Sequence, residues 1–493
     1  MVDENFLKKD RNSLDISTVS KSIGKLLNNY IKRSHTKKTP VLVQKDPKEI
    51  ASALHLKELF IKGFSSIKEI KKFTTGYLKN TNHLRHPHYM GHQVAVPQDL
   101  SGIPELIHGT VNNPSSLYEM GPAGSAIEGF MINWMLSKLD WFKGEDLYDF
   151  KIKANSGSGI LTHGGSIANL TALSAARAAI APEAWVEGSP KDLVVMGPAT
   201  AHYSIVRALS IMGMGKDSFV PVPVDNNEVI QTAELETVYE QVKAKGHRVM
   251  AVIGNACATS TGLFDPLDIM ADFCEKHKLW FHVDGAHGAV ALLSEKEKHK
   301  VKGMERADSL IWDAHKMMRV PALCTAVLFK KYQHQINNFQ QKGSYVFHES
   351  EVVGMDSMPY TVECTKSALG TKLFWTFALE GADAITEYIE KTFSLAREFY
   401  QILETHPDFY CPYAPQSNIL CFQFLRPIML TDEQQTELRY KIIEDGNFYI
   451  TSCIMNGKRF LRVVLMNPLS DKKSLHKLIN KIKETGELIL NKT

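Results

Sequence analysis

The sequence predicts an α/β protein built on a mostly parallel sheet with helices on both faces. Short apolar runs recur between residues 96 and 370, at 159–162, 192–196, 249–253, 279–283 and 309–312. Stretches with helical periodicity separate them, at 166–180, 203–212, 232–244 and 266–277. Strands that alternate with helices are typical of parallel sheets covered on both faces. Ligands of such sheets bind beyond the carboxyl ends of the strands.

Three segments are expected along the 493 residues, a length too great for one simple core. Residues 1–95 are polar and helical, and we expect them to pack at a dimer interface because they cannot bury an apolar face alone. Residues 96–370 form the large domain. Residues 371–493 form a small α+β domain, with alternating strand patterns at 418–424 and 460–465 and an amphipathic helix near the end.

Composition excludes several classes of partner. The 57 basic and 54 acidic residues give a net charge of +3, which favours neither nucleic acid nor an anionic membrane as a partner. No stretch approaches the ~18 consecutive apolar residues of a membrane span, and the first residues do not resemble a secretory signal. The seven cysteines are scattered without metal-binding spacing, which favours free thiols. We therefore expect a cytoplasmic protein with no metal site.

Lys316 and Asp284 carry the main chemical signal. Asp284 follows the apolar run 279–283, and Lys316 lies in the short polar turn after the run 309–312. A lysine amine forms a Schiff base with the aldehyde of pyridoxal phosphate, and a carboxylate can keep the pyridinium nitrogen protonated, so that the ring accepts electrons. The two residues together predict pyridoxal phosphate as the cofactor.

A second signal is the Gly164-Gly165-Ser166 turn, which follows a strand and opens a helix. Glycines let an anion approach the backbone, and the helix N-terminus offers N–H groups and a positive dipole end. This pattern suits a phosphate group, although the same residues also suit a plain turn with a cap.

Two more candidates lie after strands. His202 follows the run 192–196, where an imidazole can stack on a planar cofactor; a capping or buried structural histidine is the alternative. Thr259 follows the run 249–253, where its hydroxyl can bond the rim of a cofactor; a turn residue is the alternative.

These motifs resemble the group II pyridoxal-phosphate-dependent amino acid decarboxylases, the family of the glutamate, cysteine sulfinate and aromatic amino acid decarboxylases. The resemblance extends from about His86 to Pro468, with all motifs in family order. They are Leu84-Arg85-His86-Pro87-His88-Tyr89, Pro122…Glu128, Gly164-Gly165-Ser166…Asn169, His202-Tyr203-Ser204, Phe281-His282-Val283-Asp284 and Asp313-Ala314-His315-Lys316. The resemblance implies fold type I and a homodimer with active sites at the subunit interface.

The resemblance also implies roles for the site residues. Lys316 is the Schiff-base lysine, Asp284 pairs with the pyridine nitrogen and His202 stacks on the ring. The phosphate is held by Gly164, Gly165 and Ser166, helped by His315, and Thr259 lies beside the cofactor. This chain has Cys257-Ala258-Thr259 where the family usually has Gly-Thr-Thr, and Asp284-Gly285-Ala286-His287 where the family usually has Asp-Ala-Ala or Asp-Ala-Tyr.

Four further residues concern the substrate. Tyr345 matches the tyrosine of the family's mobile loop, which protonates the quinonoid carbon formed from the external aldimine after carbon dioxide leaves. Arg462 matches the arginine that binds the substrate α-carboxylate, a task that suits a bidentate guanidinium. His92 and Gln93 are candidates for contacting the substrate side chain, with polar loop residues as the alternative.

An L-amino acid is the expected substrate, and an acidic one is preferred: glutamate, aspartate or cysteine sulfinate. Aromatic and diamino acids stay open. Other fold-type-I reactions, such as transamination or aldehyde-forming decarboxylation, are the main alternatives, and Tyr345 argues against the oxidative one. A non-catalytic homologue is a further alternative, against which the presence of Lys316 and Asp284 argues. A nucleotide-dependent enzyme would need a Walker lysine, which the glycine turn lacks.

Overall fold

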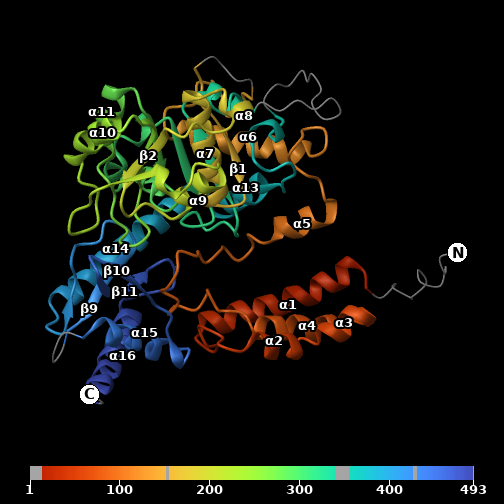
Figure 1. The fold of residues 1–493 in the computed structure, drawn as a ribbon. Helices are drawn as coiled ribbons and strands as arrows, with labels where there is room; N and C mark the ends of the chain where they lie inside the picture. The colour runs from red at the N-terminus through yellow and green to blue at the C-terminus, as the bar shows by residue number, and fades with distance from the viewer. Residues whose placement is uncertain (1–13, 151–154, 340–354, 426–429, 492–493) are drawn as a thin grey trace. The chain divides into compact units, whose positions relative to one another are not determined.

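The computed structural model describes residues 14–150, 155–339, 355–425 and 430–491. The chain forms two compact units (Figure 1). The first unit combines residues 1–92, 426–451 and 467–493, and the second combines residues 93–425 and 452–466.

A seven-stranded sheet forms the centre of the second unit. Its strand order is β1-β7-β6-β5-β4-β2-β3. The strands are β1 (Ser158–Thr162), β2 (Leu193–Pro198), β3 (Phe219–Val222), β4 (Arg248–Asn255), β5 (Trp280–Asp284), β6 (Ser309–Asp313) and β7 (Thr325–Phe329). The five strands from β6 to β3 are parallel, and β7 pairs antiparallel with both β6 and β1. The sheet is therefore mostly parallel, with an antiparallel edge.

Alternate residues of these strands enter two different cores. Val194 and Met196 of β2 belong to one core, whereas Leu193 and Val195 belong to the other. This division follows from the two-residue period of a strand. The Val195 side is covered by α7 (Gly165–Ile180) and α9 (Ser204–Ile211). The Val194 side is covered by α6 (Pro122–Ser137), α10 (Glu234–Ala244), α11 (Leu267–His277), α13 (Leu369–Glu380) and α14 (Ala382–Glu404).

A smaller sheet completes the second unit. It has the order β10-β11-β9-β8, from the strands β8 (Phe409–Tyr410), β9 (Ile419–Phe424), β10 (Thr451–Met455) and β11 (Lys458–Val464). The remaining helices of this unit are α5 (Ile103–Val111), α8 (Ala184–Glu187) and α12 (Tyr332–Ile336). Short 3-10 helices lie at Lys216–Ser218, Ala289–Leu293, Lys298–Val301, Met304–Arg306 and Met358–Tyr360.

The first unit is helical. Its helices are α1 (Ile16–His35), α2 (Pro47–Ala53), α3 (Leu56–Lys62), α4 (Ile67–Lys79), α15 (Asp432–Glu444) and α16 (Lys472–Leu490). Several N-termini are capped by side chains in the expected way: Asp15 caps α1, and Thr431 with Gln434 forms a capping box on α15. Val41, Tyr89, Ile443 and Tyr449 form a small core that joins the beginning of the chain to its C-terminal part.

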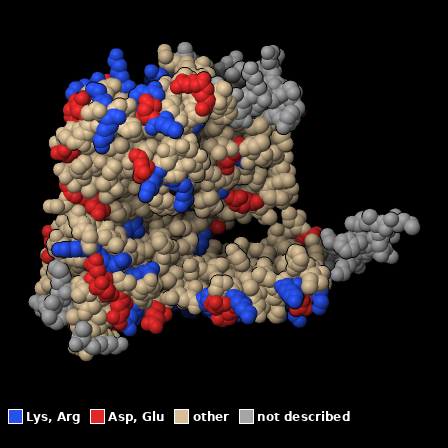
Figure 2. Space-filling view, viewed as in Figure 1, with Lys and Arg blue, Asp and Glu red and all other residues tan. Residues whose placement is uncertain are grey.

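The predicted fold class is confirmed: the protein has an α/β fold around a mostly parallel sheet. The division at residues 95 and 370 stays a prediction. On the face drawn in Figure 2, basic and acidic side chains are interspersed, as the near-balanced composition leads one to expect. Within the described ranges, none of the helices combines the length and the apolar character needed to cross a membrane.

Candidate active site

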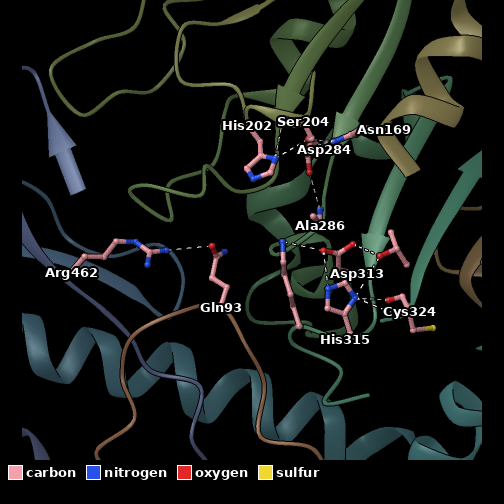
Figure 3. Close-up of polar contacts among 12 residues, drawn as sticks. Gln93, Asn169, His202, Ser204, Asp284, Ala286, Asp313, His315, Cys324 and Arg462 are labelled. Atoms are coloured by element: carbon pink, nitrogen blue, oxygen red, sulfur yellow. Dashed lines mark hydrogen bonds and ion pairs between the residues drawn. The ribbon is translucent and has the colours of Figure 1, made fainter. Parts of the chain in front are cut away.

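A cavity of about 350 Å³ lies at the carboxyl ends of the parallel strands in the second unit. That volume is within the usual range for small-ligand sites, about 300–1,000 Å³. The cavity brings together most of the residues singled out in the sequence: Gly164, Gly165, Ser166, His202, Thr259, Asp284, His315 and Lys316. Figure 3 shows the polar contacts around it.

Lys316 lies in the turn after β6, and its ammonium forms an ion pair with a residue of the same turn. Its Nζ lies 3.0 Å from Oδ2 of Asp313, which is buried. The other oxygen of Asp313 accepts a hydrogen bond of 2.6 Å from the Thr325 hydroxyl. Burial alone would lower the pKa of Lys316, but the carboxylates of Asp313 and Asp284 outweigh it, so that pKa is raised. The lysine is therefore held as an ammonium.

Asp284 ends β5 with its carboxylate fixed by two donors. Its Oδ2 accepts a 3.0 Å hydrogen bond from the Asn169 amide, and its Oδ1 accepts a 3.2 Å bond from the Ala286 backbone N–H. Hydrogen bonds to both oxygens hold the side chain in one orientation. A fixed anion in a buried position is what a protonated ring nitrogen requires as a partner.

His202 lies after β2, and hydrogen bonds with Ser204 hold its ring. Nδ1 of His202 lies 2.7 Å from the Ser204 hydroxyl oxygen and 3.3 Å from the Ser204 backbone nitrogen. Burial lowers the pKa of His202. The imidazole is therefore neutral at pH 7, and a neutral flat ring is suited to contact with a planar cofactor.

The N-terminus of α7 opens on the same cavity. Gly164 precedes it with φ 110° and ψ 159°, a conformation that only glycine adopts readily, and no side chain caps the helix. The first backbone N–H groups of this 16-residue helix therefore point to the cavity, where they can receive an anion. With an amine, a carboxylate and an anion site on one cavity, the residues fit pyridoxal phosphate.

His315 and Thr259 also line the cavity. Nδ1 of His315 lies 2.9 Å from the Cys324 carbonyl oxygen, and its Nε2 lies 3.7 Å from Oδ2 of Asp313. The Thr259 carbonyl accepts a 2.6 Å hydrogen bond from Arg462.

Arg462, on β11, is buried and is not among the residues that line this cavity. Its guanidinium donates to the carbonyls of Thr259 and Ser260, and its Nη2 lies 3.3 Å from Oε1 of Gln93. Figure 3 shows the Arg462 side chain pointing toward Gln93. Gln93 and Arg462 are therefore brought together, beside the segment that carries Thr259.

His92 is not among the residues that line this cavity. His92 belongs to the first unit, where its ring lies 5.5 Å from the ring of Tyr449. Tyr345 lies outside the residues that the structure describes.

Two features of the site were not predicted from the sequence. One is the ion pair of Asp313 with Lys316, although a carboxylate three positions before a lysine in a tight turn can reach its amine. His163 also lines the cavity, between Glu363 on its Nδ1 and the Ser367 hydroxyl, which lies 2.9 Å from its Nε2. Glu363 and Ser367 are 200 or more positions away in the chain, so only the fold reveals that contact.

The chain is similar to known proteins over most of its length. Residues 70–425 match the pyridoxal-dependent decarboxylase conserved domain. The crystal structure of mouse CSAD has a TM-score of 0.86 at 23% identity, covering 96% of this chain and 98% of that chain.

Two further solved structures have the same fold. The glutamate decarboxylase domain of diaminobutyrate-pyruvate transaminase and L-2,4-diaminobutyrate decarboxylase from Vibrio parahaemolyticus has a TM-score of 0.83 at 22% identity, with 98% of this chain and 99% of that chain covered. Oryza sativa TDC with PLP and tryptamine has a TM-score of 0.85 at 19% identity, with 97% and 99% covered.

Proposed function

The chain belongs to the pyridoxal-dependent decarboxylase family, and from that premise we propose that it removes the α-carboxylate of an acidic L-amino acid as carbon dioxide. The protein is a pyridoxal-phosphate-dependent carboxy-lyase. The observation that carries the proposal is that Lys316, Asp284 and the uncapped N-terminus of α7 share one cavity.

The cavity residues have separate tasks in this proposal. When bound, pyridoxal phosphate supplies an aldehyde for a lysine amine and a ring that takes up electrons when a bond at the substrate α-carbon breaks. The N-terminus of α7, with Gly165 and Ser166, would hold the phosphate group. Asp284 would keep a proton on the ring nitrogen, and His202 would lie against the ring face.

Lys316 must lose a proton before its amine can attack. Because Asp313 holds the ammonium form, the proton leaves more readily once the ion pair is weakened. His315 lies 3.7 Å from the same carboxylate oxygen. After the reaction, the same amine can take the place of the product amine, so Lys316 acts in both the first and the last step of the reaction.

Gln93 and Arg462 support an acidic substrate. Among the described residues, no acceptor bonds the buried Nε2 of Gln93, while its Oε1 accepts from Arg462. A guanidinium beside an unsatisfied amide donor is suited to carboxylate or sulfinate oxygens. We assign the substrate α-carboxylate to Arg462, in place of its present bonds to the Thr259 and Ser260 carbonyls, and the acidic side chain to Nε2 of Gln93. His92 stays a candidate for the side chain.

The test of this proposal is carbon dioxide release from the protein loaded with pyridoxal phosphate, measured over the twenty amino acids, cysteine sulfinate and 2,4-diaminobutyrate. The proposal expects turnover of glutamate, aspartate or cysteine sulfinate and formation of the matching amine. Release from an aromatic or diamino acid alone would keep the enzyme class and remove the acidic substrate. Cofactor binding without carbon dioxide release would favour transamination.

Tyr345 is proposed to return the proton to the α-carbon. A Tyr345→Phe variant lacks that proton donor, so in air-saturated buffer it should release carbon dioxide and consume dioxygen, forming an aldehyde, ammonia and hydrogen peroxide in place of part of the amine. Aldehyde and hydrogen peroxide assays beside the amine assay would measure this change. An unaltered amine yield would assign the proton transfer to another group.

We also propose a homodimer in the cytoplasm. Leu106, Ile107 and Val111 of α5 are about half exposed, and only Pro104 of that helix is buried. An apolar helix exposed in this way is typical of an interface. The seven cysteines are free thiols, in keeping with a reducing compartment.

A further inference from the structure

A chain of hydrogen bonds leads through buried side chains to Asp284 and His202, two of the residues that line the cavity. Nε1 of Trp280, in β5, lies 2.9 Å from the Ser309 hydroxyl oxygen in β6. That oxygen lies 2.8 Å from Nδ1 of His282. Nε2 of His282 lies 2.9 Å from Oδ1 of Asn169, in α7. All four side chains are buried, so bulk water offers them no alternative partners.

The direction of each bond is fixed by chemistry. An indole N–H can only donate, so the Ser309 oxygen accepts from Trp280. An amide oxygen can only accept, so Nε2 of His282 carries the proton it donates to Asn169. Burial lowers the pKa of His282 to about 4, which leaves a neutral ring with that single proton at pH 7. Nδ1 of His282 therefore accepts the Ser309 hydroxyl proton.

Asn169 divides the chain into two branches. With its Oδ1 facing His282, its Nδ2 lies 3.0 Å from Oδ2 of Asp284 and 2.9 Å from the Ser204 hydroxyl oxygen. A carboxylate can only accept, so the amide cannot be turned around without placing two oxygens against each other. Both Nδ2 hydrogens are thus used, one in each branch.

The second branch determines the tautomer of His202. The Ser204 oxygen accepts from Asn169, and its own proton remains available for Nδ1 of His202, 2.7 Å away. The Ser204 backbone N–H, 3.3 Å away, points to the same nitrogen. A nitrogen that receives two donors carries no proton. The neutral ring of His202 is therefore protonated on Nε2.

We propose that Asn169 is the positioning residue of this site: one amide hydrogen fixes the ionised carboxylate of Asp284, and the other fixes the Nε2-protonated tautomer of His202 through Ser204. His282, Ser309 and Trp280 hold the amide in that orientation. The inference rests on the proposed function for its purpose, because Asp284 and His202 are the groups assigned to the cofactor ring. It goes beyond that function because it states which atom donates and which accepts in each hydrogen bond of this network.

The test compares dissociation constants of pyridoxal phosphate, measured by titrating the cofactor into the cofactor-free protein. Asn169→Ala should weaken binding about 10-fold or more, because it leaves buried acceptors without a donor. Asn169→Asp places a second carboxylate against Asp284, and two such groups share one proton. The dissociation constant of that variant should change between pH 6 and pH 8 as the shared proton is lost, a dependence absent from Asn169→Ala.

Asn338→Ala is the matched control. Its buried amide also donates to α7, to the Thr171 carbonyl at 3.0 Å, but Asn338 is not among the cavity-lining residues. It should leave the dissociation constant within about 2-fold of the wild-type value, since none of the bonds to Asp284 or His202 changes. Equal weakening by Asn338→Ala and Asn169→Ala, or no weakening by either, would overturn the proposal.

A second measurement needs no variant. ¹⁵N NMR of the histidine-labelled, cofactor-free protein should show His202 and His282 as neutral rings protonated on Nε2. A proton on Nδ1 of either ring would contradict the assigned chain. Failure of the wild-type protein to bind pyridoxal phosphate would remove the proposed function instead, and the tautomers would still test the hydrogen-bond chain by itself.

Discussion

At the scale of the residue, the ion pair between Lys316 and Asp313 leads to a prediction about pH. The raised pKa of Lys316 means that the nucleophilic amine becomes more abundant as pH rises, so pyridoxal phosphate should enter the cofactor-free protein faster at pH 9 than at pH 7. Asp313→Asn removes the main group that raises this pKa, and burial then lowers it. The variant should incorporate the cofactor faster at pH 7 and with less dependence on pH, as stopped-flow absorbance would measure.

Asp308→Asn serves as the control for that experiment. The Asp308 carboxylate accepts a 2.9 Å hydrogen bond from the Phe281 backbone N–H and makes no ion pair with Lys316. Its profile of rate against pH should match that of the wild-type protein. Identical profiles for Asp313→Asn and the wild type would mean that Asp313 does not control the amine.

Removal of the Asp284 carboxylate should affect the reaction more than cofactor binding. Asp284→Asn keeps the shape of the side chain but cannot hold a proton on the ring nitrogen. Preorganised charges of this kind are worth on the order of 10²–10³ in kcat. The measurement is kcat for carbon dioxide release beside the dissociation constant of the cofactor. A loss confined to cofactor affinity would contradict the role assigned to Asp284.

Residue-level analysis of the sequence singled out residues that the structure brings to one cavity, but it did not include the contacts that hold them there. Lys316, Asp284 and His202 could be grouped because strand ends of a parallel sheet meet at one edge. The partners Asp313 and Asn169 were visible in the same motifs, but hydrogen-bond direction depends on distances that spacing does not give. The carbonyl contacts of Arg462 likewise depend on how β11 and the Thr259 segment pack.

At the scale of the element, the N-terminus of α7 is the expected phosphate site. Gly164→Ala forces a side chain into a conformation that costs about 1–3 kcal/mol, and the strain should displace the N–H groups that face the cavity. Gly381 precedes α14 with nearly the same backbone angles, φ 82° and ψ 163°, but is not among the cavity-lining residues. Both variants should lower the free energy of unfolding in urea, whereas only Gly164→Ala should weaken binding of pyridoxal phosphate. Equal affinity in both variants would contradict a phosphate site at this helix.

β1 is fixed by a buried ion pair that leads to a further prediction about stability. Lys366 Nζ contacts Oε1 of Glu128 and donates to the Leu161 carbonyl at 3.0 Å, while the same Glu128 oxygen accepts the Leu161 N–H. Lys366→Met leaves the Glu128 charge buried and unpaired, which should cost about 3–5 kcal/mol of unfolding free energy.

The exposed pair of Lys243 and Glu240 provides the comparison for that variant. Lys243→Met should leave the midpoint of the same urea titration nearly unchanged, because a solvated pair contributes little. Adding Glu128→Gln to Lys366→Met should restore part of the loss. A cost for Lys366→Met no greater than that for Lys243→Met would show that the buried pair does not stabilise β1.

The helices and strands predicted from the sequence match the structure where the residue pattern fits only one kind of element. The strand expected at 249–253 lies within β4, and the strand expected at 279–283 and the helix expected at 166–180 match β5 and α7 within one residue at each end. β7 was missed, because a five-residue apolar run can be a strand or part of a buried helix. Its antiparallel place between β1 and β6 depends on the whole sheet, which local pattern does not specify.

At the scale of the whole molecule, the exposed face of α5 leads to a prediction of dimerisation. Leu106→Asp combined with Ile107→Asp places charges on that face, so the protein should shift toward the monomer in analytical ultracentrifugation. Leu488→Asp, at an isolated exposed leucine of α16, should leave the sedimentation coefficient unchanged. A wild-type protein that sediments as a monomer would contradict the proposed homodimer.

The most direct measurement of the central claim is the identity of the lysine that carries the cofactor. Incubation with pyridoxal phosphate, reduction with borohydride and peptide mass spectrometry should place the added pyridoxyl mass on Lys316, and the absorbance band near ~420 nm should be absent from Lys316→Ala. The cavity that Lys316 shares with Asp284 and the N-terminus of α7 predicts this result. Labelling of other lysines, or no labelling with the cofactor in excess, would contradict it.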